Sequence, residues 1–191
     1  MNLLKFHNKI KGYTQNRQPG IEADMEPKPI AELEEYKAAG KLENKVALIT
    51  GGDSGIGRAI AILYAKEGAN VAIGYYDEHQ DAEDTVNRLQ EMGVKAKAYA
   101  HDLKDEKQSQ KLIKDVINDF GSLNILVNNG GVQFPRDHFE DITPQQVKET
   151  FMTNIFGMMF LSQAAVPYLS EGDTIINTTS VTAYRGSGHL I

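Results

Sequence analysis

The residues best suited to chemistry lie in a glycine-rich stretch, T-G-G-D-S-G-I-G-R, at positions 50–58. An apolar run over 46–49 precedes it and an amphipathic pattern over 56–68 follows, which predicts a strand, a tight turn and a helix. Glycines in such a turn let backbone N–H groups approach a pyrophosphate, and the helix N-terminus adds its positive dipole end. The alternative is a turn that needs glycine for its geometry alone. The flanking strand and helix favour phosphate binding.

Strand and helix patterns alternate along the chain around and after this turn. Short apolar runs predict strands over 46–49, 71–73, 95–100, 123–127 and 174–177, and helical periodicity predicts helices over 56–68, 81–92, 106–120 and 144–169. Five strands and four helices in alternation predict an α/β fold, a doubly wound, Rossmann-like parallel sheet with right-handed crossovers. Thr143 is the expected N-cap of the last helix, and Gln146 is expected to reach back in a capping box.

Composition excludes several classes of protein. The chain has 191 residues, a formal charge of −6 and no cysteine, which excludes disulfides, thiolate metal sites and cysteine nucleophiles. We predict no metal site, and the negative charge argues against nucleic acid as a partner. The stretch 151–169 is apolar, but Asn154, Ser162 and Gln163 within it argue against a membrane span. No signal peptide is recognised, so a cytoplasmic protein is expected.

Four motifs together resemble those of the short-chain dehydrogenase/reductase family. They are T-G-x-x-x-G-I-G at 50–57, N-N-G-G at 128–131 where the family has N-N-A-G, Asn154 in the long helix, and I-I-N-T-T-S at 175–180. Their order along the chain also matches. The resemblance implies an oxidoreductase that transfers hydride between a nicotinamide cofactor and a small carbonyl or alcohol substrate.

An N-terminal arm, residues 1–42, differs from the predicted dinucleotide-binding domain at 43–191. The arm carries a formal charge of +1 and the domain −7. Segments 18–22 and 40–42 resemble the N-terminal extension of a bacterial subgroup that includes general stress dehydrogenases. The arm is expected either to be disordered or draped over the surface, or to pack on a neighbouring subunit, because full-length family members form homo-oligomers.

The resemblance also implies which residues contact the cofactor. Asp102 would hydrogen-bond the adenine, although a charge at a helix N-terminus is an alternative role for it. Asn128 would brace the sheet and line the cofactor cleft, or act in the structure alone, whereas His101 is expected to be an ordinary loop residue. The implied cofactor-binding residues are Gly51, Asp53, Ser54, Gly55, Ile56, Gly57, Tyr75, Asp102, Leu103 and Asn128.

The choice between NAD and NADP depends on the end of the second predicted strand. An acid there accepts a hydrogen bond from the ribose 2′-OH, whereas a basic residue accommodates a 2′-phosphate. Tyr75 occupies the position of the acid, and Asp77 and Glu78 follow it. No lysine or arginine occurs over 74–87, and Ser54 stands where NADP-dependent members often carry a basic residue. The local acidity favours NAD, with NADP not excluded.

The catalytic residues that the resemblance implies are Asn154 and Ser180. Ser180 would hydrogen-bond the substrate oxygen, and Asn154 would hold a water of the proton relay through a distorted helix turn. The family's general acid and base is a tyrosine in a Tyr-x-x-x-Lys motif further along the chain. Tyr184 lies too close to the serine, and no lysine follows Lys148. We therefore predict a chain truncated before that helix, with five of the expected strands.

Three interpretations remain open at this stage, one of which is a short chain that assembles with a complementing fragment. The first is an NAD(P)-dependent short-chain dehydrogenase/reductase by family, of which this chain alone has little or no activity because it lacks the catalytic Tyr and Lys. The second is a non-catalytic dinucleotide-binding remnant or regulatory module. A hydrolase is disfavoured, because no G-x-S-x-G elbow surrounds Ser180.

Overall fold

Five parallel strands form one sheet in the computed structural model, which describes residues 15, 17, 20–33 and 35–186. The order across the sheet is β3-β2-β1-β4-β5, so β1 lies at the centre with β2 and β4 on its two sides. The strands are β1 (Val46–Thr50), β2 (Asn70–Tyr75), β3 (Ala96–Ala100), β4 (Ile125–Asn128) and β5 (Thr174–Asn177). The predicted doubly wound α/β fold is confirmed.

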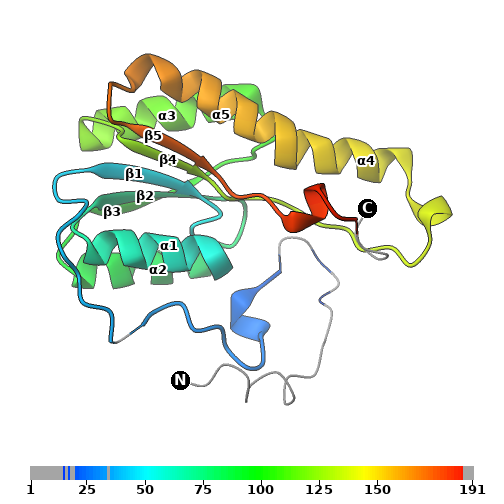
Figure 1. Ribbon diagram of the computed structural model, residues 1–191, viewed down its shortest axis with the longest axis horizontal. Coiled ribbons are helices and arrows are strands. Elements are labelled where there is room, and N and C mark those ends of the chain that lie inside the picture. Colours follow the sequence, from blue (N-terminus) through cyan, green and yellow to red (C-terminus); the bar gives the residue numbers. More distant parts are fainter. Residues whose placement is uncertain (1–14, 16, 18–19, 34, 187–191) are drawn as a thin grey trace.

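Helices cover both faces of this sheet. Helices α1 and α2 lie on one face, and α3 lies with the α4–α5 rod on the other (Figure 1). The α-helices are α1 (Gly55–Lys66), α2 (His79–Glu91), α3 (Glu106–Phe120), α4 (Pro144–Phe151) and α5 (Gly157–Ala165). A π-helical turn, η4 (Met152–Phe156), joins α4 to α5, and short 3-10 turns are η2 (Glu22–Asp24), η3 (Phe139–Asp141), η5 (Val166–Tyr168) and η6 (Val181–Ala183).

None of the helices in the described part of the chain is long and apolar enough to cross a membrane.

Strand β1 is buried on both faces, which explains its unbroken apolar sequence. Ile49 belongs to the core layer beneath α1 and α2, together with Ile73. Leu48 belongs to the opposite layer, together with Leu126 and Leu161. Because successive side chains of a strand point to opposite faces, these two layers fix the register of β1. They also fix where its last residue meets the neighbouring strands.

The helix predicted over 144–169 is one rod with an irregular centre. Thr143 caps its start as expected, because its Oγ1 accepts a hydrogen bond of 3.1 Å from the backbone N–H of Gln146. The expected capping box is wrong, because the Gln146 amide instead donates to the carbonyl oxygen of Phe134 at 2.9 Å. The π turn in the middle contains Asn154, where a distorted helix turn is expected from the sequence.

The described part of the arm is draped over the surface of its own domain. Glu67, at the C-terminal end of α1, accepts hydrogen bonds from the Tyr36 hydroxyl and from the backbone N–H groups of Ala39 (3.1 Å) and Lys41 (2.8 Å). Glu32 pairs with Arg88 of α2 at 2.9 Å. The first of the two expectations for the arm therefore holds for these residues. Packing on a neighbouring subunit stays a prediction.

We predict that the Glu67 contact makes stability depend on pH. The Tyr36 hydroxyl, followed by the Lys41 backbone N–H, lowers the pKa of the Glu67 carboxyl from 4.5 to about 2. Since the folded pKa is below the unfolded value, the stabilisation is present above pH 4.5 and is lost as the pH falls through about 2. Glu67→Gln should therefore destabilise the protein at neutral pH, by a margin that shrinks below pH 4.5.

Urea unfolding over a series of pH values tests this, with exposed Glu83→Gln on α2 as the control. A destabilisation by Glu67→Gln that stays constant as the pH falls would contradict the assignment.

Candidate functional site

The glycine turn connects β1 to α1 at the carboxyl edge of the sheet. Gly51 has a φ of +60°, a conformation that L side chains rarely adopt. A Cβ at Gly57 would overlap the carbonyl oxygen of Gly51 and lie 2.8 Å from Nδ2 of Asn129. The first turn of α1 can pack this closely against the loop only because Gly57 has no side chain.

A second segment, after β4, is joined directly to this turn. The Thr50 hydroxyl accepts hydrogen bonds from the backbone N–H groups of Asn129 (3.0 Å) and Gly130 (2.9 Å). Asn129 also donates from Nδ2 to the Thr50 carbonyl oxygen at 3.1 Å. Thr50 is buried, so these contacts are shielded from water. They hold the glycine turn and the residues after β4 as the two walls of one crevice.

The crevice opens into a cavity of about 960 Å³. That volume lies in the range of ligand-binding pockets. Among the lining residues are most of the predicted cofactor-binding set, namely Gly51, Asp53, Ser54, Gly55, Ile56, Tyr75, Asp102 and Leu103. Gly57 and Asn128 from that set are not part of the lining. The lining also includes residues that the sequence did not single out for the site, among them Gln15, Arg17, His101, Lys104 and Asn129.

Asn128 braces the sheet and does not line the cavity. Its Nδ2 donates to the Ser162 hydroxyl of α5 at 3.1 Å and to Oδ1 of Asn177 in β5 at 2.8 Å. The side chain is buried, and it is the next residue, Asn129, that lines the cavity. Of the two roles expected for Asn128, the described contacts fit the structural one.

Asp102 lies at the cavity wall in the turn after β3. Its Oδ1 accepts a hydrogen bond of 2.9 Å from the backbone N–H of Lys104. The alternative role, a charge capping the next helix, belongs instead to Asp105, whose carboxylate accepts from the N–H groups of Lys107 and Gln108. Lys104 extends from this turn and forms ion pairs with Asp102 and, at 2.7 Å, with Glu149 of α4.

His101 is buried in the cavity wall, not an ordinary loop residue. Neither ring nitrogen has a hydrogen-bond partner among the described residues. Burial lowers the pKa of the imidazole, which favours the neutral ring. A Cβ at Gly74 would lie 2.5 Å from Cε1 of His101. The glycine inside strand β2 was the signal in the sequence that a side chain packs there.

Asp53 is a buried acid of the glycine turn. Burial raises the pKa of its carboxyl, and the carboxylates of Asp81 and Glu22 add to this rise. Thr85 of α2 donates to the Asp53 backbone carbonyl at 2.9 Å, which attaches the turn to α2.

The two predicted catalytic residues, in the π turn between α4 and α5 and after β5, do not line the cavity. Asn154 lies in the π turn, where its side chain exchanges two hydrogen bonds of 2.8 Å with the backbone N–H and carbonyl of Val132. Ser180 is exposed and caps η6 by accepting from the backbone N–H of Thr182 at 3.2 Å. The described residues contain no group of three or more His, Asp or Glu side chains that could hold a metal ion.

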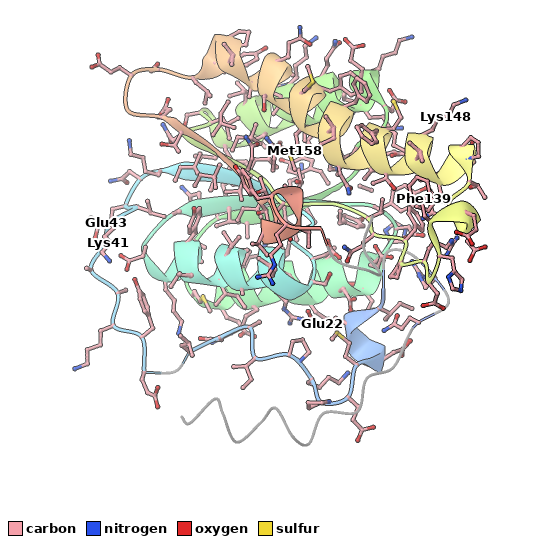
Figure 2. The ribbon with its side chains drawn as sticks, turned by 45° about the vertical axis from the view of Figure 1, so that its right-hand side comes forward. Glu22, Lys41, Glu43, Phe139, Lys148 and Met158 are labelled. Atoms are coloured by element: carbon pink, nitrogen blue, oxygen red, sulfur yellow. The ribbon has the colours of Figure 1, made fainter. Side chains whose placement is uncertain are left out.

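The arm reaches the same site. Figure 2 shows Glu22 on the η2 turn, below the ends of α1 and α2. Its Oε2 accepts a hydrogen bond of 2.6 Å from the backbone N–H of Gly55, and its Oε1 lies 2.9 Å from Nη1 of Arg58. A carboxylate is thus bound at the positive N-terminal end of α1. Arg17 pairs with Asp77 and Glu78 beside the cavity.

This parallel sheet, with a glycine turn at the start of α1 and a cavity at its carboxyl edge, defines a dinucleotide-binding type of fold. Residues 45–191 match the family model for short chain dehydrogenases. The chain belongs to the short-chain dehydrogenase family.

Individual relatives agree with this family assignment. Over 189 residues the chain is 47% identical to General stress protein 39 of Bacillus subtilis, covering 99% of this chain and 66% of the relative. It is 42% identical to glucose and ribitol dehydrogenase of Daucus carota, covering 93% and 63%. A crystal structure of a Burkholderia cenocepacia short chain dehydrogenase in complex with NADP matches with a TM-score of 0.76 at 35% identity, covering 78% and 61%. The chain therefore spans less than two thirds of the length of these proteins.

We predict that Gly57→Ala destabilises the fold. The added Cβ must displace the carbonyl of Gly51, and overpacking of this kind costs on the order of 1–3 kcal/mol. Chemical denaturation measures the change in the free energy of unfolding. Gly186→Ala is the matched control, because a Cβ there meets open space. Equal stabilities for the two variants would contradict the close approach of α1 to the turn.

Proposed function

We propose that this chain forms the dinucleotide-binding part of an NAD(P)-dependent oxidoreductase. The observation that carries the proposal is the cavity at the carboxyl edge of the sheet, where the glycine turn, the ends of β2 and β3 and the segment after β4 converge. Open α/β sheets bind their ligands at such crevices. Family membership of residues 45–191 supports the same conclusion.

The residues at this edge fit the chemistry of a dinucleotide. The glycines at 51 and 57 keep the cradle free of side chains. The N-terminal end of α1, where the Glu22 carboxylate binds the N–H of Gly55, favours negative charge such as that of a pyrophosphate. Asp102 would hold the adenine with the backbone of Leu103 beside it, and both residues line the cavity.

The reaction proposed is hydride transfer involving a small carbonyl or alcohol. When bound, the nicotinamide ring supplies or accepts the hydride. Ser180, exposed after β5, would hydrogen-bond the substrate oxygen. Asn154 would hold a water of the proton relay, and its place in a π turn supports this role because such turns are frequent at functional sites.

We further propose that the 191-residue chain alone turns over little substrate. The family's proton donor belongs to a Tyr-x-x-x-Lys motif, whereas the sequence after Ser180 contains Tyr184 and no lysine. A non-catalytic dinucleotide-binding module is the second candidate function, and the cavity at the carboxyl edge of the sheet supports it equally.

We also propose that the protein forms a homo-oligomer in the cytoplasm. Apolar side chains of the α4–α5 rod support it, because Phe151 and Met159 are 53% and 58% exposed. Large apolar side chains gathered on one exposed surface are typical of interfaces.

We predict that the folded chain binds NADH or NADPH. Asp102→Ala should weaken this binding about tenfold or more, because it removes a charged hydrogen-bond acceptor from the adenine site. Fluorescence titration measures the dissociation constants, with exposed Asp84→Ala on α2 as the control. Failure of either dinucleotide to bind the well-folded chain would contradict the proposed function.

We also predict that turnover depends on a Tyr-x-x-x-Lys motif. The chain alone should reduce a panel of aldehydes at least about 10²-fold more slowly than an ordinary enzyme, because general acid–base catalysis contributes about 10²–10⁴-fold. Fusion to the corresponding C-terminal part of General stress protein 39 should restore activity, measured by oxidation of the reduced cofactor. Ordinary rates for the chain alone would contradict the role of the motif. A folded fusion that binds the cofactor without turnover would favour the non-catalytic module.

A further inference from the structure

The corner of the cavity next to the end of β2 combines local acids with a distant arginine. Asp77 and Glu78 follow β2, and the sequence over 74–87 supplies no lysine or arginine to balance them. The arm supplies Arg17, whose Nη2 lies 2.9 Å from Oδ1 of Asp77 and also bonds to the Glu78 carboxylate. Arg17 and Glu78 both line the cavity, together with Tyr75 at the end of β2.

The contacts of the arm explain why Arg17 lies at this corner. The side chain of Gln15 forms two hydrogen bonds with the backbone of Ile21, of 2.8 Å and 2.7 Å, which join two positions of the arm on either side of Arg17. Glu22 then ties the arm to Gly55 and Arg58 at the start of α1. The position of Arg17 is therefore set relative to the glycine turn itself.

The charge at this corner of the cavity determines whether it can bind a ribose that carries a 2′-phosphate. Burial raises the pKa of the Glu78 carboxyl to about 7, and the adjacent Asp77 adds to the rise. Without a cation, the two acids would repel a 2′-phosphate, which carries close to two negative charges at neutral pH. With Arg17 in place, the corner holds a guanidinium, a planar cation whose N–H donors match the geometry of phosphate oxygens.

Building on the proposed dinucleotide function, we propose that Arg17 is a specificity residue that binds the 2′-phosphate of NADP. The N-terminal arm is then part of the cofactor site and not only a cover for the domain. This inference revises the expectation of NAD, which was drawn from the residues after β2 alone.

The test compares NADPH and NADH binding to the 191-residue chain by fluorescence titration. Arg17→Ala should weaken NADPH binding about ten- to a hundredfold and NADH binding by less than about threefold, because only NADPH carries the phosphate that Arg17 contacts. Arg17→Lys should retain part of the NADPH affinity, since it keeps the charge but loses the planar fork.

Arg88→Ala is the matched control. Arg88 also holds the arm, through Glu32, but it does not line the cavity. The variant should leave the ratio of the two dissociation constants unchanged. Thermal melts of each variant establish that it is folded.

The outcomes separate the two proposals. Equal losses of NADPH and NADH binding in Arg17→Ala would show that Arg17 only holds the arm, and would overturn the inference while leaving the dinucleotide function standing. An unchanged NADPH affinity would overturn it too. No binding of either dinucleotide to the folded wild-type chain would overturn the proposed function and this inference with it.

Discussion

The site depends on one buried hydroxyl that joins two crossover loops. Thr50, the last residue of the central strand, accepts hydrogen bonds from the N–H groups of Asn129 and Gly130, which begin the segment after β4. Loss of a buried acceptor that serves two N–H groups is costly, because each orphaned donor costs about 1–3 kcal/mol. Gly57 lets α1 pack against the same turn. The crevice between the turn and this segment exists because both contacts are made at the centre of the sheet.

Much of the fold could be predicted from the sequence because strand burial and helix periodicity are local signals. The sequence correctly predicts strand β1 from its unbroken apolar run and the helix cap at Thr143. It wrongly predicts a capping box at Gln146, because the Gln146 side chain bonds to a tertiary acceptor, the carbonyl of Phe134. The burial of His101 is not predicted for a similar reason. Its burial depends on Gly74, which is 27 positions away in the chain but packs against it in the sheet.

The contacts of the arm could not be predicted from local sequence patterns. The contacts of Arg17 and Glu22 join residues 33 to 61 positions apart, and no periodic pattern in the sequence connects them. The Arg17–Asp77 pair is half-exposed, and ion pairs of this kind contribute only about 0–1 kcal/mol to stability. These ion pairs matter because they fix the positions of charged groups at the cavity. The residues after β2 alone predict an acidic ribose site, whereas the folded chain adds a guanidinium to it. The charge at this corner of the cavity is thus a tertiary property of this chain.

The central claim is that the glycine turn, the segment after β4 and the arm form one dinucleotide site. Hydrogen–deuterium exchange with and without saturating NADPH tests it most directly. Bound cofactor should slow exchange in peptides covering 50–57, 101–103 and 129–132, and also in the arm over 20–24. Protection confined to the glycine turn, with the arm and the residues after β4 unchanged, would contradict the claim.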